Sequence, residues 1–241
     1  MISYEEFMPT SSDLPLLAQL RRSDPDRYFA TLFAPASRRD DLTLLYLLNH
    51  ELARAREVAS NPMLALIRLQ WWREVVEGQP KKHELATPLA LALAAGRLPR
   101  EDLLALITAR EMEADDTIPD FPTFLIYARG TGGRLARIAG KILGVDSPEI
   151  EDLGTSYAIS GILRAAPFLA RQERSLLPAD GTAPDILRAQ SLALLASRPP
   201  RGAFAAWAPA AFVRRDLGRA YAPRGTLDRL AVLRAALMGR A

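Results

Sequence analysis

Acidic side chains gather at one place in the sequence where they could bind a metal ion. The group lies at the end of a predicted helix and comprises Glu111, Glu113, Asp115 and Asp116. Carboxylate oxygens are the ligands that Mg²⁺ prefers in proteins, so these residues could hold this ion. The alternative is a solvated helix end, which we favour because Asp and Glu side chains are mostly exposed.

Other patterns of catalytic residues are missing from the sequence. His50 and His83 are the only histidines, neither has a partner at the spacing of a zinc site, and the chain has no cysteine. No Gly-x-Ser-x-Gly nucleophile motif occurs. The glycine-rich run from Gly130 to Gly133 interrupts a helical pattern, either so that backbone amides approach a ligand or so that two helices pack closely. The sequence leaves these two interpretations open.

Helices are the elements that must position these residues. Ala, Leu and Arg dominate the composition and β-branched residues are sparse, which favours helix over strand. Apolar residues recur at helical spacing between prolines, glycines and aspartates, and no long linker divides the chain. We therefore expect a single all-α domain over residues 1–241. The predicted helices cover residues 14–22, 26–33, 38–58, 62–77, 85–95, 100–114, 123–143, 148–172, 183–196, 202–220 and 226–238.

The net charge of +3 is divided unevenly along the chain. Residues 1–120 hold 14 Lys and Arg against 19 Asp and Glu, whereas residues 121–241 hold 17 against 9. A basic half could face nucleic acid, anionic lipid or an acidic protein. The arginines are spread at helical spacing with no basic run interleaved with aromatic residues, so we expect solvated helix faces and no nucleic-acid partner.

The sequence predicts a protein that does not cross a membrane. The longest nearly uncharged apolar stretch, Leu85 to Ala95, is too short to span a bilayer. The N-terminus lacks the basic and then apolar order of a signal peptide. We expect a cytoplasmic location, with peripheral contact to the inner membrane as an option.

Five segments resemble, in the same order, the squalene/phytoene synthase family. Four of them run from Tyr28 to Arg39, Leu44 to Asn49, Arg68 to Glu74 and Tyr127 to Gly133. The fifth has two parts, Ile162 to Arg164 and Leu177 to Pro178. In the third, Trp71 and Trp72 anchor a helix in the core or stack on a ligand or partner. The resemblance implies the all-α isoprenoid-synthase bundle, with a shortened C-terminal end as one option. After Pro199 it carries no clear motif, so we expect helical packing alone.

Members of this family condense isoprenyl diphosphates. Two Asp-x-x-x-Asp motifs on facing helices hold Mg²⁺ in these enzymes, because residues i and i+4 share one helix face. Here the first motif falls on Ala53 to Glu57, where only Glu57 is acidic and Arg54 adds positive charge. The second falls on Ala165 to Leu169, which contains no carboxylate, and Pro167 is expected to perturb that helix. The resemblance therefore implies a pseudoenzyme without catalytic residues.

The same departures resemble an offshoot of the family, the phytoene-synthase-like assembly factors of respiratory complex I. The shared residues are Asn49-x-Glu51-Leu52-Ala53 and Leu163-Arg164-Ala165-x-Pro167. This resemblance implies a protein that assists assembly of a respiratory complex and has subunits of that membrane complex as partners. Two alternatives stay open: a protein that binds an isoprenoid lipid such as a quinone, and a prenyltransferase with a rebuilt site. Only the last would use a cofactor, Mg²⁺ held by Glu57 and Glu113.

On this resemblance, the residues that match family motifs line a cavity. They are Tyr28, Tyr46, Arg54, Glu57, Tyr127 and Arg164. Core packing would also explain the tyrosines. Arg164 could bind a phosphate or form a buried salt bridge with Glu57 or Glu113.

Overall fold

The computed structural model describes residues 15–59, 61–115, 117–218 and 222–241. Helices make up almost all of the regular structure in these ranges, and their only β interaction is an isolated bridge between Ile118 and Pro178. The prediction of an all-α fold is therefore confirmed.

The first half of the bundle consists of helices α1 to α6 and a short 3-10 turn. Their bounds are α1 (Leu16–Ser23), α2 (Pro25–Thr31), α3 (Ala36–Glu57), α4 (Pro62–Glu77), α5 (Ala86–Ala94), α6 (Arg100–Glu111) and η3 (Met112–Ala114).

The described residues of the second half form seven helices, a π-helical turn, η4, and two 3-10 turns, η5 and η6. Their bounds are α7 (Phe121–Ala128), η4 (Arg129–Gly133), α8 (Arg134–Ile142), α9 (Pro148–Ala170), α10 (Pro184–Leu194), η5 (Arg201–Ala203), α11 (Phe204–Trp207), η6 (Ala208–Phe212), α12 (Val213–Leu217) and α13 (Thr226–Met238).

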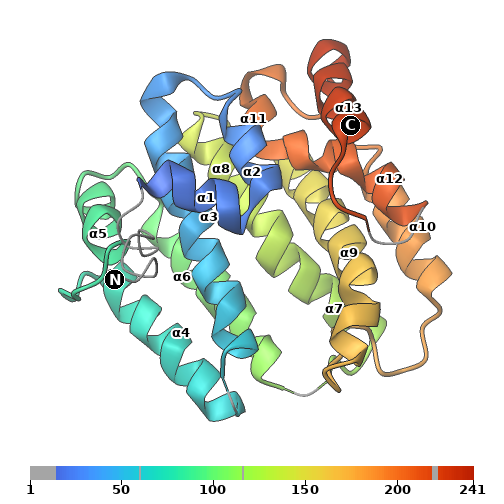
Figure 1. The fold of residues 1–241 in the computed structure, drawn as a ribbon, viewed down its shortest axis with the longest axis horizontal. Coiled ribbons are helices and arrows are strands. Elements are labelled where there is room, and N and C mark those ends of the chain that lie inside the picture. The colour runs from blue at the N-terminus through green and yellow to red at the C-terminus, as the bar shows by residue number, and fades with distance from the viewer. Residues whose placement is uncertain (1–14, 60, 116, 219–221) are drawn as a thin grey trace, which may run out of the picture.

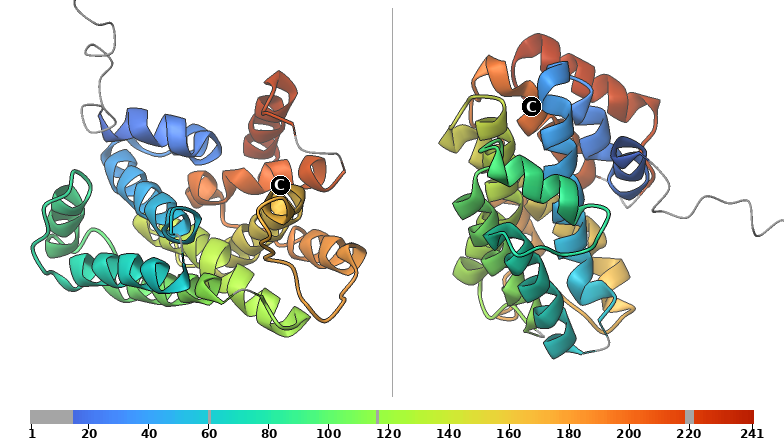
Figure 2. Two further views of the ribbon diagram at one scale, coloured as in Figure 1. Left: turned by 60° about the horizontal axis from the view of Figure 1, so that its bottom comes forward. Right: turned by 90° about the vertical axis from the view of Figure 1, so that its left-hand side faces the viewer.

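The two longest helices, α3 and α9, stand on either side of α8 (Figures 1 and 2). Helices α4 and α6 pack on the α3 side, and α10 and α12 pack against α9. In Figure 1 both long helices run from top to bottom, so their C-terminal ends lie at the same end of the bundle. These ends are where the two aspartate-rich motifs of the family would fall.

Side-chain caps and prolines set several helix starts. Asp24, Asn61 and Asp120 each accept a hydrogen bond from a backbone N–H in the first turn of the helix that follows, and each helix has a proline at its first or second position. Such caps satisfy amides that have no partner within the helix. At the other end of α4, Gly78 has φ = 104°, which ends the helix with a left-handed residue.

Glycines let η4 and α8 approach α9 closely. A Cβ atom on Gly132 would lie 2.5 Å from the Cβ of Ala158, and one on Gly154 would lie 2.4 Å from the Cβ of Ala136. Such separations are far inside van der Waals contact. Of the two interpretations of the glycine-rich run, the structure supports close helix packing.

Two predicted helices are divided in the structure. The range 123–143 contains the π-helical turn η4 between α7 and α8, and the range 202–220 contains η6, which has a proline in its first turn. The prediction that Pro167 perturbs its helix is wrong in one respect, because α9 continues through Pro167 to Ala170. The proline lies in the last turn of α9, so the backbone hydrogen bond that it cannot donate is missing only near the end of the helix.

None of the helices in the described ranges is both long and apolar enough to cross a bilayer.

Adding a methyl group to Gly154 should loosen the contact between α8 and α9. We expect Gly154→Ala to lower the free energy of unfolding by about 1–3 kcal/mol, because the new carbon overlaps Ala136. Urea denaturation followed by circular dichroism measures the change.

Gly161→Ala is the matched control, since Gly161 lies on the same helix and a Cβ there meets no atom within 4 Å. This variant should gain about 0.4–1 kcal/mol from the reduced freedom of the unfolded chain. Equal losses in the two variants would contradict the close-packing interpretation.

Candidate functional site

The first motif position lies in the last turns of α3. Glu57 is the final residue of the helix and is exposed, and it makes no hydrogen bond or ion pair with another described residue. Arg54 is also exposed and pairs with Glu51, with 3.4 Å between the guanidinium nitrogen and the carboxylate oxygen. This position therefore offers one carboxylate, directed to solvent and next to a cation.

The second motif position lies at the C-terminal end of α9. The residues from Ala165 to Leu169 supply no carboxylate, and Phe168 is exposed there. In the described part of the chain, no three His, Cys, Asp or Glu side chains come together as a group that could hold a metal ion. The donor atoms at the two motif positions thus do not fit the Mg²⁺ site that the family resemblance implies.

Glu113 is buried, and its carboxylate is already bound by neighbouring side chains. Its Oε1 accepts hydrogen bonds from Tyr127 Oη at 2.6 Å and from Arg110 Nη1 at 2.5 Å. Arg110 also donates to Asn49 Oδ1 at 2.9 Å. Burial and the nearby carboxylate raise the pKa of Tyr127 well above its usual value, so the phenol stays protonated and donates.

The acidic group predicted around this residue does not form a common site. Glu111 accepts a hydrogen bond from Arg73 on α4 at 2.6 Å, whereas Glu113 turns inward. Asp115 is exposed, and Asp116 lies outside the described residues. The expectation of a solvated helix end is therefore wrong for Glu113.

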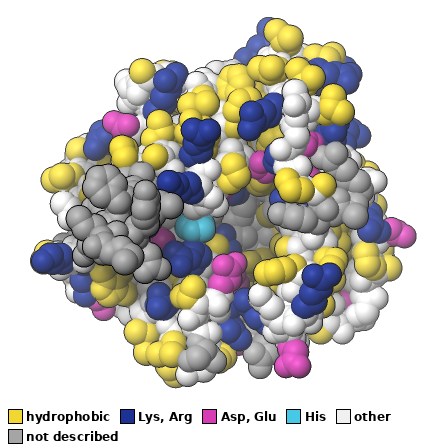
Figure 3. Space-filling model, in the orientation of Figure 1, with side chains coloured by type: hydrophobic (Ala, Val, Ile, Leu, Met, Phe, Trp, Pro, Cys, Tyr) yellow, Lys and Arg dark blue, Asp and Glu magenta, His cyan; other side chains and the backbone are white. Residues whose placement is uncertain are grey.

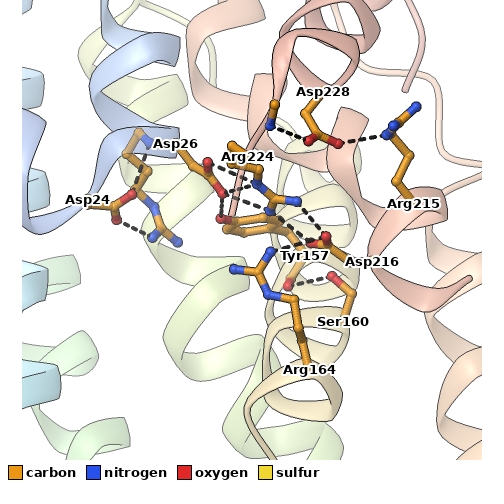
Figure 4. Close-up of polar contacts among 11 residues, drawn as sticks. Asp24, Asp26, Tyr157, Ser160, Arg164, Arg215, Asp216, Arg224 and Asp228 are labelled. Carbon is orange, nitrogen blue, oxygen red and sulfur yellow. Dashed lines mark hydrogen bonds and ion pairs between the residues drawn. The ribbon is translucent and has the colours of Figure 1, made fainter. Parts of the chain in front are cut away.

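A second buried charge cluster joins the C-terminal segment to α2 and α9 (Figure 4). We call it the C-terminal clamp and define it as Asp26, Arg164, Asp216 and Arg224. The guanidinium of Arg224 donates to Asp26 at 2.8 Å and to Asp216 at 2.5 and 2.9 Å. Arg164 donates to Asp216 at 3.1 Å. Burial opposes the charge of Arg224, but its bonds to Asp216 and Asp26 raise its pKa above the usual value.

Tyr157 and Arg27 extend this polar region into the bundle. Tyr157 Oη donates to Asp26 at 2.8 Å, and Arg27 forms an ion pair with Asp24 at 2.7 Å. The Arg27 guanidinium lies 5.3 Å from the ring centroid of Tyr157 and 5.8 Å from that of Tyr46, close enough for cation–π attraction. Arg27 therefore links the rings of α3 and α9 across the interior.

Tyr46 is buried in this interior. Its Oη and the Nε1 of Trp207 make no hydrogen bond with a described residue, and both side chains line a cavity of about 10 Å³ beside Arg27. Burial raises the pKa of Tyr46. The cavity is about the size of one water molecule and too small for a prenyl chain. The face drawn in Figure 3 is hollowed between α3 and α9, in front of α8.

The sequence-predicted residues are only partly brought together. Tyr46 and Tyr127 are buried, Tyr28 is half-buried against the core, and Arg54 and Glu57 are exposed. Arg54 instead lines a surface groove of about 310 Å³ beside Trp71, Trp72 and His83.

Arg164 forms a salt bridge as one alternative predicted, but its partner is Asp216 rather than Glu57 or Glu113. Sequence reasoning missed Asp26, Asp216 and Arg224. Composition is the one indication of these residues that the sequence offers, because residues 201–241 hold eight arginines but only two acidic residues.

A model of the family described as squalene/phytoene synthase matches residues 20–238 of the chain. Complex I assembly factor 6 from Rattus norvegicus is 29% identical over 181 residues, which are 70% of this chain and 54% of that protein. The Homo sapiens protein of the same name is 27% identical over 173 residues, 68% of this chain and 52% of that protein. The chain thus spans about half the length of these relatives.

Solved structures of two synthases share the fold. A dehydrosqualene synthase in complex with ligand gives a TM-score of 0.72 at 13% identity and covers 93% of each chain. Squalene synthase HpnC from Alicyclobacillus acidocaldarius gives 0.60 at 17% identity, over 95% of this chain and 98% of that one. At these identities the likeness concerns the fold, and the predicted isoprenoid-synthase bundle is confirmed.

Removing the central cation of the C-terminal clamp should destabilise the protein strongly. We expect Arg224→Leu to lower the free energy of unfolding by about 3–5 kcal/mol, because buried Asp26 loses its ion pair and buried Asp216 keeps only the one with Arg164. Arg224→Lys keeps the charge but loses the forked geometry, so its loss should be smaller.

Arg188→Leu serves as the control, since its ion pair with Asp185 is exposed. Its stability should change by no more than about 0.5–1 kcal/mol. Similar chemical denaturation curves for Arg188→Leu and Arg224→Leu would disprove the structural importance of the clamp.

Proposed function

The chain belongs to the squalene/phytoene synthase family, and we propose that it is a non-catalytic member that assists the assembly of a respiratory complex. The observation that carries the proposal is the neutralisation of interior carboxylates by arginine. Glu113 is bound by Arg110, and Asp26 and Asp216 are bound by Arg224. These carboxylates are therefore engaged within the protein.

The chemistry of the family explains why this matters. An aspartate-rich site keeps its carboxylates free for Mg²⁺, and the metal in turn binds diphosphate oxygens. In this chain the two motif positions together offer Glu57 alone, which is exposed at the end of α3. An arginine can hold a phosphate, but it does not supply the Lewis acidity of a metal ion. The interior is thus suited to stabilising the fold.

The assembly role is supported by the relatives named complex I assembly factor 6. Their similarity covers about half of their own length, so the proposal concerns the part of their role that this shared region carries. The same relatives favour subunits of a membrane respiratory complex as partners of this chain.

The hollow between α3 and α9 favours a second candidate function, the binding of an isoprenoid lipid (Figure 3). The Oη of Tyr46, which makes no hydrogen bond with a described residue, would offer a polar contact to a quinone-like head group. This function also requires no metal ion.

The folded protein is expected to release no pyrophosphate from farnesyl or geranylgeranyl diphosphate, with Mg²⁺ or with a chelator. The reason is that the motif positions offer only one carboxylate. A coupled pyrophosphate assay measures the release, with a dehydrosqualene synthase as positive control. Release that needs Mg²⁺ and that Glu57→Ala abolishes would establish the enzyme instead.

The assembly role predicts that an affinity-tagged chain co-purifies with subunits of a membrane respiratory complex. Deletion of its gene in the source organism should reduce the amount of assembled complex, as measured by native gel electrophoresis. Glu57→Ala should restore the complex as well as the unaltered chain does, because the role needs no metal ligand at this position.

Pull-downs without such subunits, together with normal complex levels in the deletion strain, would refute the assembly role. An isoprenoid lipid recovered by organic extraction of the purified protein would then support the second candidate. If the extract contained no isoprenoid lipid either, both candidate functions would be excluded.

A further inference from the structure

The C-terminal helix α13 presents a row of exposed apolar side chains. The row comprises Leu227, Leu230, Leu233, Leu237 and Met238. Steps of three or four residues place most of them on one helix face, and Leu237 is 88% exposed. The opposite face, which includes Val232 and Ala235, is buried against the bundle. Helix α13 thus has one apolar face for the core and a second one that no described residue covers.

Arginines surround the outer face. A groove of about 630 Å³ runs beside the helix, and apolar residues of α13 line it together with arginines. These arginines are Arg214, Arg215, Arg234 and Arg240. In Figure 3 this edge of the molecule, at the upper right, shows apolar side chains gathered between Lys and Arg side chains. Helix α13 lies at the same edge in Figure 1.

The two carboxylates of this segment are withdrawn from the surface. Asp216 is buried in the C-terminal clamp, and Asp228 is buried against Arg215, which donates to it at 2.7 Å (Figure 4). Residues 201–241 contain no other acidic residue. The exposed arginines of the segment, including Arg234 and Arg240, therefore act as a positive field that the segment itself does not neutralise.

We propose that the outer face of α13, with its arginine-lined groove, docks on the surface of a bilayer that contains anionic lipids. Leucines supply apolar area for the boundary of the acyl chains, while arginine stems lie along apolar surface and place their charged ends at lipid phosphates. Both contributions are present on one face of one helix. The proposal goes beyond the assembly role and does not depend on it, because a scaffold, a lipid carrier or an enzyme could use this face.

The positive charge on the outer face of α13 favours a bilayer, and not a second copy of the chain, as its binding partner. A symmetric pair that joined two α13 helices would place each arginine-bordered face against an identical one. Arg234 lies within the leucine row, so cations would meet cations where the leucines pack. Like charges in contact oppose such pairing, whereas anionic lipid phosphates complement the same residues.

The test uses the full chain and sedimentation with vesicles. We expect binding to phosphatidylcholine vesicles that contain phosphatidylglycerol, weaker binding to pure phosphatidylcholine, and loss of the difference at high salt. The double variant Leu230→Ser/Leu237→Ser should bind anionic vesicles roughly tenfold more weakly or worse. Arg234→Gln/Arg240→Gln should weaken binding to anionic vesicles alone.

Met63→Ser/Ile67→Ser is the matched control, because it removes two exposed apolar side chains from another helix, α4. This control should bind as the unaltered chain does, and circular dichroism confirms that each variant is folded. Folded protein that binds neither kind of vesicle would overturn the proposal. So would equal binding by the control and the leucine variant, or a dimer in sedimentation equilibrium that only the leucine substitutions dissociate.

Discussion

The need to place a cation beside each buried carboxylate is the constraint on which the rest of this bundle depends. Asp26, Glu113 and Asp216 are almost fully removed from water, and each lies within hydrogen-bond distance of an arginine guanidinium. An unpaired charge in such surroundings would cost several kcal/mol, so a cation must accompany each carboxylate. In a metal-dependent synthase a bound ion can be that cation. In this chain the cation is an arginine side chain of the protein itself.

These ion pairs limit what the interior can bind. A metal ion can be shared between protein and substrate oxygens, but an arginine that satisfies two carboxylates has little capacity left for a diphosphate. Arg224 illustrates the point, since its nitrogen atoms are divided between Asp26 and Asp216. Tyr127, with its pKa raised by burial and by Glu113, likewise has its proton directed to a protein acceptor. The side chains that form these bonds therefore have few free donor atoms left for a ligand.

The sequence predicted the helices well because their ends depend on local chemistry. Prolines, caps and apolar spacing mark the bounds, and α4 and α13 begin and end at the predicted residues. The clamp could not be predicted in this way, because Asp26 and Arg224 are separated by 198 positions and no spacing rule connects them. For Arg164 the chemistry of a salt bridge was accessible, but its partner depended on where α12 packs against α9. The inward turn of Glu113 likewise follows from the neighbouring Tyr127 rather than from the acidic run.

The outer surface follows from the same constraint. The C-terminal segment has two aspartates, and the interior takes both of them, one in the clamp and one against Arg215. Arg234 and Arg240 lie outside, beside the exposed leucines of α13. The result is a basic, apolar face on α13 whose charge complements an anionic bilayer.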